Sequence, residues 1–401
     1  MYGGISFMKK VLAINSGSSS FKYKLFAIPE EKVLAEGIAD RVGIDGSSFE
    51  IKLANGEKHT QEIAIPDQET AVNLLLKALK DYHVVDDLSE IVGVGHRIVA
   101  GGEDFTDSAI IDQAKLQKIY DLKEYAPLHN PAEGKGIEAF MKLLPDVPEV
   151  GVFDTSFHQT LDPEHYIYSI PYEYYEKYGI RKYGAHGTSV RYIVGRAGQM
   201  LKKDVEDLKL IVCHLGSGAS VTAVKNGKSY DTSMGFTPLA GITMGTRSGD
   251  VDPSVLQYIM NKDHLDINEM IDILNDKSGL LGISGISSDM RDLENNSAQR
   301  AALARKIFVN RVRQYVGSYI VELKGVDAII FTAGVGEHDA GIREEVMKSF
   351  EFMGLEPDYE ANKSNGEKFI SKPDSKIKAL VIPTDEELMI ERDVVRLAHL
   401  N

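Results

Sequence analysis

Residues 11–25, VLAINSGSSSFKYKL, place an apolar run directly before a loop of glycine and serine and then resume a strand-like run. A tight hairpin needs only a two-residue turn, so this loop carries more polar groups than turning requires. Glycine and serine expose backbone N–H groups and hydroxyls that together can cradle a phosphate, and Lys22 adds a positive charge. Serine-rich loops are more often plain connectors, so both interpretations stay open for this stretch alone.

Residues 210–227, LIVCHLGSGASVTAVKNG, repeat the same plan near the middle of the chain. Each copy has an apolar strand, one polar side chain, a Gly-Ser loop and a second strand. The repeat favours a duplicated architecture in which two such loops face one cleft, and the alternative is a coincidence between short strand-turn-strand segments. Asn226-Gly227 at the end of the second copy predicts a hairpin turn.

Short β-branched runs alternate with amphipathic stretches along most of the chain, which favours layered α/β domains. The sequence predicts strands over 10–15, 21–27, 91–97, 149–154, 209–214, 219–225, 327–332 and 378–382. It predicts helices over 68–82, 131–144, 187–203, 252–262, 297–323 and 385–399. The stretch 331–339, FTAGVGEHD, is typical of a strand, a glycine-rich turn and then a helix. In the helix over 297–323, large apolar residues recur every three or four positions, which indicates a core face or a subunit interface.

The bulk composition excludes several classes of function. A chain of 401 residues is expected to form two or three domains. With 45 basic and 60 acidic side chains the formal charge is −15, which argues against broad nucleic-acid binding. The single cysteine fits the reducing cytoplasm, and no apolar run approaches the roughly 18 residues that a membrane span needs.

The familiar nucleotide-binding signatures are absent. Gly227-Lys228-Ser229 resembles the end of a P-loop, but Thr222 stands where the earlier glycine is required. The glycine pairs within 93–95, 216–218 and 334–336 lack the third glycine of a dinucleotide fingerprint.

Charged residues follow several predicted strands and loops. Arg97 and Arg247 could grip a carboxylate and a phosphoryl group in bidentate fashion, or could be surface ion-pair partners. Asp154 at a strand end and Glu386 at a helix start suit Mg²⁺ binding, or could be helix caps. His186 could cap the helix that follows it. Together with the phosphate loops, these groups are the parts that phosphoryl transfer requires.

Many ordered segments resemble the acetate kinase (acetokinase) family of the acetate and sugar kinase/heat-shock chaperone/actin superfamily. The resemblance runs from about Met8 to the end of the chain. The segments are NSGSSSFK, HRIVAGG, PLHNP, FDTSFH, HGTS, HLGSGAS, DTSMGFTPL, MGTRSGDVDP, SGISSDMRDL, FTAGVGE and PTDEEL.

The resemblance implies an α/β chain with two ribonuclease-H-like domains in a duplicated, actin-like architecture around a central cleft. The first domain would span 1–156 and be completed by the C-terminal helix 386–401. The second, over 157–385, would hold the nucleotide site and the interface of a homodimer. The Gly-Ser loops of the two copies would then be the phosphate-binding hairpins of the duplicated fold.

The implied activity is a cytoplasmic, Mg²⁺-dependent transfer that interconverts acetate plus ATP with acetyl phosphate plus ADP, with Mn²⁺ as the alternative metal. By resemblance, the catalytic residues are Asp154, Arg97, Arg247 and His186. The residues of the substrate pocket are Arg97, Val99, Leu128, Ala185 and Pro238. The residues that bind nucleotide and phosphate are Asn15, Lys22, His214, Leu215, Gly216, Ser217, Gly218, Asp289, Met290, Arg291, Gly334, Val335 and Gly336. The metal ligands are Asn15, Asp154 and Glu386.

This chain departs from the family pattern at four positions. It has Ala185 in place of an aromatic residue, Val190 in place of a histidine, and Ser217 and His338 in place of asparagines. Two alternatives therefore remain: a kinase that prefers propionate or butyrate, and a nucleotide-binding regulator that has lost catalysis.

Overall fold

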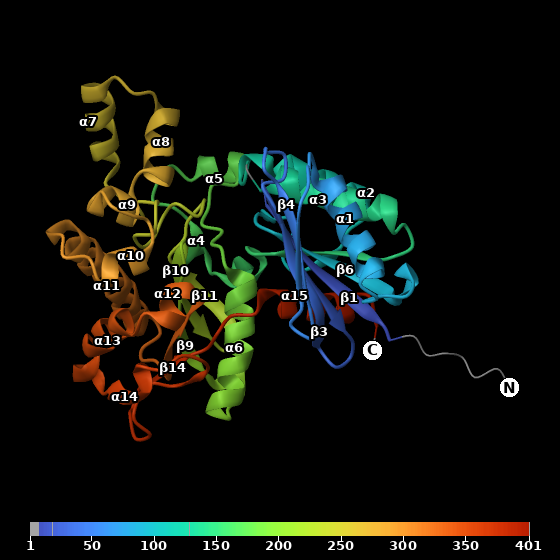
Figure 1. Cartoon of the computed structure of the whole chain (residues 1–401). Helices are drawn as coiled ribbons and strands as arrows, with labels where there is room; N and C mark the ends of the chain where they lie inside the picture. The colour runs from blue at the N-terminus through green and yellow to red at the C-terminus, as the bar shows by residue number, and fades with distance from the viewer. Residues whose placement is uncertain (1–7, 18, 128, 401) are drawn as a thin grey trace. The chain divides into compact units, whose positions relative to one another are not determined.

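The computed structural model describes residues 8–17, 19–127 and 129–400 (Figure 1). The chain forms two compact units. Unit 1 comprises Met1–Ser156 and Asp385–Asn401, and unit 2 comprises Phe157–Thr384. The C-terminal segment therefore belongs to the same unit as the N-terminal strands.

Among the described residues, unit 1 is built on an eight-stranded sheet in the order β5-β4-β3-β2-β1-β6-β8-β7. Its strands are β1 (Lys10–Ser16), β2 (Ser20–Ala27), β3 (Lys32–Asp40), β4 (Ser48–Leu53), β5 (Lys58–Glu62), β6 (Ile91–Ile98), β7 (Ala109–Ile110) and β8 (Glu149–Phe153). Its helices are α1 (Gln68–Asp81), α2 (Gln113–Asp121), α3 (Asn130–Leu143) and α15 (Glu386–Leu397). Successive residues of β1 point to opposite faces, so Leu12 and Ile14 share a core with α1 and α3, and Val11 and Ala13 share one with α15.

Unit 2 is built on a six-stranded sheet, counted over the described residues, in the order β11-β10-β9-β12-β14-β13. Its strands are β9 (Lys209–Leu215), β10 (Ala219–Lys225), β11 (Lys228–Thr232), β12 (Ala328–Thr332), β13 (Lys368–Phe369) and β14 (Lys378–Val381). Its first helices are α4 (Pro163–Tyr166), α5 (Glu173–Tyr178), α6 (Gly187–Leu201), α7 (Pro253–Asp263), α8 (Ile267–Asp276) and α9 (Gly279–Ser284). The later ones are α10 (Met290–Glu294), α11 (Gln299–Glu322), α12 (Ala333–His338), α13 (Ala340–Lys348) and α14 (Tyr359–Asn362).

The two sheets share one central pattern. In unit 1 the strands β3, β2 and β1 are antiparallel neighbours, and β6 and β8 continue the sheet parallel to β1. In unit 2 the strands β11, β10 and β9 are antiparallel, and β12 and β14 continue parallel to β9. The predicted α/β class and its internal repeat are confirmed. The hairpin predicted at Asn226-Gly227 is also present, with positive φ at both residues as a two-residue turn requires.

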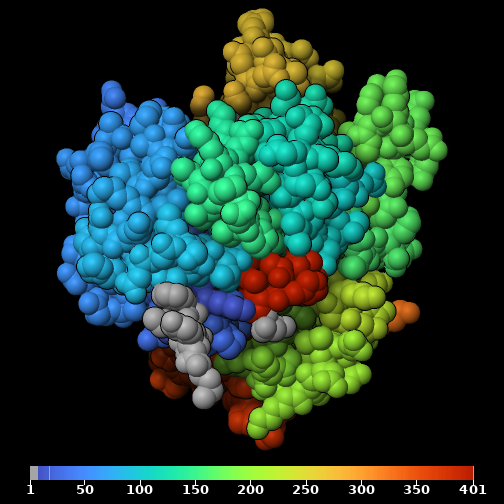
Figure 2. All heavy atoms as spheres, turned by 90° about the vertical axis from the view of Figure 1, so that its right-hand side faces the viewer, coloured from blue at the N-terminus to red at the C-terminus, as the bar shows by residue number. Residues whose placement is uncertain are grey.

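Glycines in β6 allow α15 to pack closely on the sheet. A Cβ on Gly93 would lie 2.4 Å from Val394 Cγ1, and a Cβ on Gly95 would lie 2.4 Å from Ile390 Cγ2. This close approach explains the two glycines of the segment 93–95, which lacks the third glycine of a dinucleotide fingerprint. Figure 2 shows the exposed side of α15, in red, at the surface of unit 1.

Several elements differ from the sequence prediction. The strands β3, β4 and β5 were not predicted, and β5 reads KHTQE with four of its five residues exposed, so it has no apolar alternation. The segment 333–338 was expected to begin as a turn but is the helix α12, which starts directly after β12. The long helix α11 is confirmed, and its predicted apolar stripe lies in the core of unit 2. Within the described residues, no helix is long and apolar enough to cross a membrane.

Buried Glu391 in α15 makes the stability of unit 1 depend on pH. Glu391 is 2% exposed, and burial raises its pKa from 4.5 to about 7. Between these values the folded form keeps a proton that the unfolded chain releases, so stability falls as pH rises through this window. We expect Glu391→Gln to raise the free energy of unfolding at pH 8 by about 1–3 kcal/mol. Urea unfolding at pH 5 and pH 8 measures this, with exposed Glu30→Gln as the control, and an equal effect at both pH values would contradict it.

Candidate functional site

The β1–β2 hairpin brings the two polar residues of the first loop motif together. Asn15 and Lys22 are paired across the antiparallel strands, so their side chains lie on the same face of the sheet. Beyond them the backbone turns tightly, with Gly17 N–H donating to Ser20 O at 2.7 Å. The hairpin therefore holds an amide and an ammonium side by side next to a glycine-serine turn.

Arg97, at the end of β6, is the centre of a charge cluster in unit 1. Its guanidinium donates to Asp154 Oδ2 from Nη2 at 2.6 Å and from Nε at 3.1 Å, and Nη1 donates to Asn15 Oδ1 at 3.4 Å. Its Nε also lies 3.7 Å from Glu386 Oε2. The Arg97 side chain is 20% exposed, so its ion pairs with Asp154 and Glu386 are partly shielded from solvent.

The electrostatics of this cluster follow from burial. Burial by itself would lower the pKa of Arg97, but Asp154 and Glu386 outweigh it and raise that pKa. Burial raises the pKa of Glu386, Arg97 opposes the rise, and the Asp154 charge adds to it. Helix capping does not explain Glu386, because the N-cap of α15 is Asp385, whose carboxylate accepts from Leu388 N. Glu386 is the first helical residue and is available for another role.

An asparagine and a glutamate in α3 hold the chain that follows Arg97. Asn130 Oδ1 accepts from Ala100 N at 3.2 Å and its Nδ2 donates to Ala100 O at 3.0 Å. Glu133 accepts from Val99 N at 3.2 Å, and burial raises its pKa to about 8 against the opposing charge of Arg97. The sequence analysis missed both roles, although Asn130 lies within the PLHNP segment.

In unit 2 the His186 ring joins a hydrogen bond on one side to a ring stack on the other. Its Nδ1 lies 2.9 Å from Ser220 Oγ, and its ring stacks on the His214 ring at 4.0 Å between centroids. His214 Nδ1 is 2.9 Å from Ser189 Oγ, which is 2.7 Å from Thr384 Oγ1. His186 has a left-handed φ of 61° at the N-cap position of α6 without a side-chain cap bond, so capping does not explain it.

Arg247 lies at the same hairpin loop as His186. A Cβ added to Gly218 would be 3.3 Å from Arg247 Nη1 and 3.7 Å from His186 Nε2, so both side chains approach the β9–β10 turn. Arg247 Nη1 also donates to Pro238 O at 3.4 Å. Burial lowers the pKa of Arg247, and Asp276 partly offsets this. Arg247 and His186 thus lie together at the glycine turn between β9 and β10, and this group is called the loop cluster below.

Ala185, which precedes His186, is held in the core. It is 4% exposed, and its carbonyl oxygen lies 2.8 Å from His158 Nε2. His158 Nδ1 is 2.8 Å from Ser229 Oγ, so this buried imidazole links Ala185 to β11.

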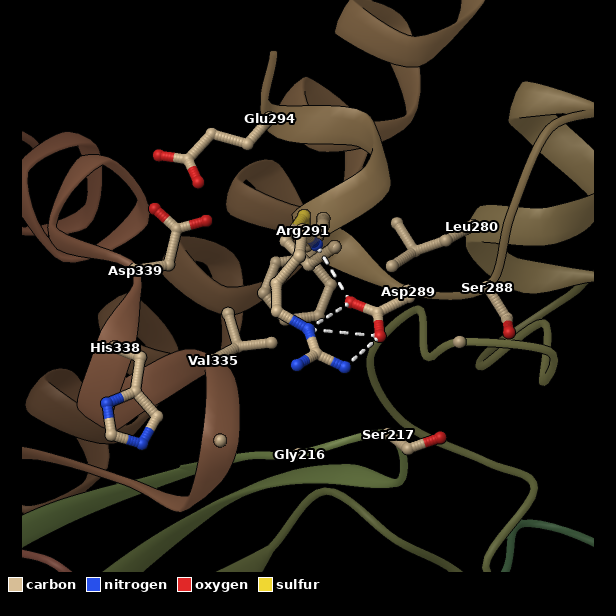
Figure 3. Close-up of a pocket in the computed structure, with 14 residues that line it drawn as sticks. Gly216, Ser217, Leu280, Ser288, Asp289, Arg291, Glu294, Val335, His338 and Asp339 are labelled. Carbon is tan, nitrogen blue, oxygen red and sulfur yellow. Dashed lines mark hydrogen bonds and ion pairs between the residues drawn. The ribbon is translucent and has the colours of Figure 1, made fainter. Parts of the chain in front are cut away.

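A cavity of about 410 Å³ lies beside this loop cluster in unit 2 (Figure 3). Its lining combines apolar side chains with a few polar groups, which is typical of small-molecule sites. The predicted residues that line it are Gly216, Ser217, Asp289, Met290, Arg291, Gly334 and Val335. The lining residues that the sequence analysis did not predict are Gly245, Leu280, Ser288, Glu294, Phe308, His338 and Asp339. Arg291 binds the Asp289 carboxylate and is the main cause of the fall in its pKa to about 2.

The structure places the other predicted residues as follows. Val99 lies in unit 1, and Leu215 and Gly336 lie in unit 2, with Gly336 buried in α12. Leu128 lies outside the described residues.

The oxygen atoms of Asn15, Asp154 and Glu386 surround one guanidinium, and such an all-oxygen donor set fits the ligand preference of Mg²⁺.

Comparison with known proteins gives consistent matches over the whole chain. The model of the Acetokinase family matches residues 10–392. Acetate kinase of Geobacillus kaustophilus is 55% identical over 98% of this chain and 100% of that protein. The structure resembles Porphyromonas gingivalis acetate kinase with TM-score 0.93 and 44% identity, covering 97% and 99% of the two chains. It resembles a propionate kinase from Francisella tularensis with TM-score 0.91 and 39% identity, covering 97% and 100%.

Removing the Asn130 side chain should destabilise unit 1. Asn130 is fully buried and makes hydrogen bonds to Ala100 and Ile119, and Asn130→Ala would leave buried backbone groups without partners. We expect the free energy of unfolding to fall by about 2–4 kcal/mol. Asn73→Ala is the matched control, because Asn73 is exposed and bonds only to its own helix, and it should change stability by less than about 0.5 kcal/mol. An equal loss of unfolding free energy in the two variants would show that the contacts of Asn130 with Ala100 do not stabilise unit 1.

Proposed function

We propose that this chain interconverts acetate plus ATP with acetyl phosphate plus ADP in a Mg²⁺-dependent reaction. The chain belongs to the acetokinase family and is a kinase that transfers phosphate between ATP and acetate. An acetate oxygen forms a bond to the γ-phosphorus while the bond from that phosphorus to the β–γ bridging oxygen breaks. ADP leaves with the electron pair of the broken bond. Because acetate is already ionised at neutral pH, no strong general base is needed, and alignment and charge neutralisation carry the catalysis.

The positively charged groups have the first role in this proposal. Arg97 and Arg247 bind the acyl and phosphoryl oxygens, whose negative charge spreads in the transition state. His186 donates a hydrogen bond to the transferred group. Its link to Ser220 and its stacking on His214 hold the imidazole in a fixed orientation.

The metal ligands are proposed to be Asn15, Asp154 and Glu386, with Mg²⁺ as the ion and Mn²⁺ as the alternative. The bound ion supplies positive charge to the phosphate oxygens. Asp154 also keeps Arg97 in place through two hydrogen bonds, so its carboxylate orients both a cation and a guanidinium.

The nucleotide is proposed to occupy the cavity of about 410 Å³ in unit 2, which has apolar walls at Leu280 and Phe308 for a base. The Gly216–Gly218 turn at its edge offers backbone N–H groups to the phosphates. Ser217 reaches less far than the asparagine of the family pattern but still offers a hydroxyl.

The observation that carries the proposal is the Arg97 cluster, where one partly buried guanidinium and two carboxylates meet beside a glycine-serine hairpin. A hydroxamate assay with ATP, Mg²⁺ and acetate tests it, because hydroxylamine traps acetyl phosphate. Folded protein that binds ATP but forms no acyl phosphate from any short acid would favour the regulator that has lost catalysis. A preference for propionate or butyrate is not favoured, since the full-length relatives of higher identity are acetate kinases.

We also propose a cytoplasmic homodimer. None of the residues of α7 is buried, and the pair α7–α8 projects from the rest of unit 2 in Figure 1. Val255, Tyr258, Ile267 and Ile271 on these helices are 37–65% exposed, and a second copy of the chain would cover them. Light scattering on the purified chain should give the mass of two chains, and a monomer at micromolar concentration would refute the dimer. The one cysteine, buried Cys213, supports a reducing location.

Loss of either arginine should slow turnover strongly. We expect Arg97→Ala and Arg247→Ala each to reduce kcat by roughly 10²–10³-fold, because transition-state charge is no longer stabilised. Lysine at either position should restore little, since bidentate geometry is lost. Steady-state kinetics measure this against Arg313→Ala, which removes an exposed arginine from α11. Near-normal activity in either variant would show that its arginine has a structural role and does not take part in catalysis.

Glu386 should affect the metal requirement. We expect Glu386→Gln to raise the Mg²⁺ concentration for half-maximal activity by roughly tenfold or more, because a charged ligand is lost. Glu387→Gln is the control, since its carboxylate pairs with Lys24 at 3.2 Å. Asp154→Asn should raise the Mg²⁺ requirement and also lower kcat, because it weakens the contact with Arg97. Unchanged Mg²⁺ dependence in Glu386→Gln would remove Glu386 from the metal site.

A further inference from the structure

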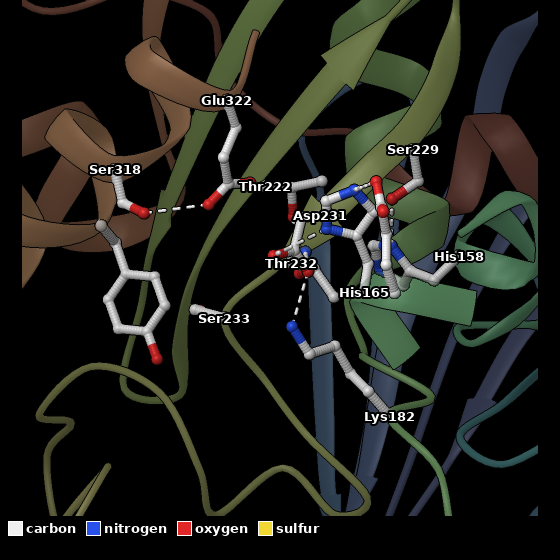
Figure 4. A network of polar contacts seen from close by, with 12 residues as sticks. His158, His165, Lys182, Thr222, Ser229, Asp231, Thr232, Ser233, Ser318 and Glu322 are labelled. Atoms are coloured by element: carbon white, nitrogen blue, oxygen red, sulfur yellow. Dashed lines mark hydrogen bonds and ion pairs between the residues drawn. The ribbon is translucent and has the colours of Figure 1, made fainter. Parts of the chain in front are cut away.

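A second cluster of ionisable side chains lies in unit 2, among residues to which the proposed reaction assigns no role (Figure 4). His165 comes from α4, Asp231 from β11 and Glu322 from the end of α11. One ligand atom from each lies within 4.8 Å of the other two. In the part of the chain that the structure describes, this is the one such grouping of three histidine, cysteine or acidic side chains.

The two oxygens of Asp231 have different surroundings. Oδ1 accepts from Lys182 Nζ at 2.6 Å and from Thr232 N at 2.7 Å. Oδ2 faces His165 Nδ1 at 3.7 Å, which is longer than a hydrogen bond. The carboxylate is therefore anchored through one oxygen and presents the other to the imidazole.

The α11 side of the cluster contains polar atoms that are buried but unsatisfied. Glu322 Oε1 accepts from Ser318 Oγ at 2.9 Å, whereas Oε2 has no hydrogen-bond partner among the described residues. The hydroxyl of Tyr319, three residues earlier on the same helical face, also has none there, and Tyr319 is only 2% exposed. Asp231 and Glu322 both contribute to the rise in the Tyr319 pKa, after burial, so these groups lie near one another. Most buried polar atoms of folded proteins have a hydrogen-bond partner, so these unsatisfied atoms require an explanation, of which a bound ion is one.

The charge of the cluster favours a cation. Asp231 and Glu322 bring two negative charges, and Lys182 supplies one positive charge. A buried surplus of negative charge is costly unless a counter-charge is present.

We propose that His165 Nδ1, Asp231 Oδ2 and Glu322 Oε2 bind one divalent transition-metal ion of the Zn²⁺ class. One imidazole and two carboxylates suit such an ion, whereas Mg²⁺ prefers oxygen ligands alone. The second ring nitrogen of His165, Nε2, is also buried without a hydrogen-bond partner among the described residues, and the Glu164 carboxylate lies 3.7 Å from it.

The proposed ion braces the segment that leads to His186. Lys182 N donates to Tyr166 O at 2.8 Å, so the α4 region is bonded to the strand-like chain four residues before His186. A cation bound by α4, β11 and α11 would therefore hold the chain around Lys182 in place, four residues before His186. The site is structural and uses none of the residues assigned to Mg²⁺.

Metal binding to the intact protein tests the proposal. Protein stripped with a chelator is dialysed against Zn²⁺ with excess Mg²⁺, and bound zinc is measured by elemental analysis. We expect wild type to retain one equivalent more than His165→Gln, and Glu322→Gln to bind that equivalent at least tenfold more weakly. Glu345→Gln, which removes an exposed glutamate of α13, is the matched control and should bind like wild type.

A second readout separates binding from misfolding. Zn²⁺ at about 100 times its Kd should raise the Tm of wild type and of Glu345→Gln by roughly 5 °C and leave His165→Gln unchanged. Circular dichroism of the zinc-free variants checks that they are folded. Equal zinc retention by wild type and both cluster variants, or no retained zinc in wild type, would overturn the proposal. Neither result bears on the hydroxamate assay, so the two proposals fail independently.

Discussion

The ion pair between Arg97 and Asp154 is the constraint on which the site in unit 1 depends. A guanidinium keeps its proton at every physiological pH, so burying it requires an anion. Asp154, 1% exposed at the end of β8, supplies that anion at 2.6 Å. Glu386 then brings a second carboxyl group to 3.7 Å from the same guanidinium. The same contacts therefore gather carboxyl oxygens around Arg97, where the divalent cation is proposed to bind.

The position of Glu386 depends in turn on the packing of α15. That helix comes from the end of the chain, and Gly93 and Gly95 in β6 let Ile390 and Val394 approach the sheet where any larger residue would collide. Because Arg97 ends the same strand, helix packing and charge placement are fixed by one element. These two glycines, whose segment lacks the third glycine of a dinucleotide fingerprint, are thus needed for packing.

Much of the fold could be predicted from local patterns, and less of the site. The buried central strands are nearly continuous apolar runs, α11 has apolar residues at helical spacing, and Asn226-Gly227 specifies its own turn. The strand β5 could not be predicted, because its residues are polar and exposed. The contacts of Asn130 and Glu133 with the chain after Arg97 cross about 30 residues and leave no local signature. Motif resemblance supplied the list of site residues, but only the fold shows what holds them in place.

The duplicated hairpins show how one scaffold serves two purposes. In unit 1 the pair Asn15 and Lys22 lies across β1 and β2, and Lys22 is exposed, so its charge is available to a ligand. In unit 2 the pair His214 and Ser220 lies across β9 and β10, and both residues are buried. These two side chains contact His186, so this side-chain pair of the second hairpin holds another residue. The backbone plan is the same, so the difference arises from the side chains and their burial: Lys22 faces solvent, whereas His214 and Ser220 lie against the imidazole of His186.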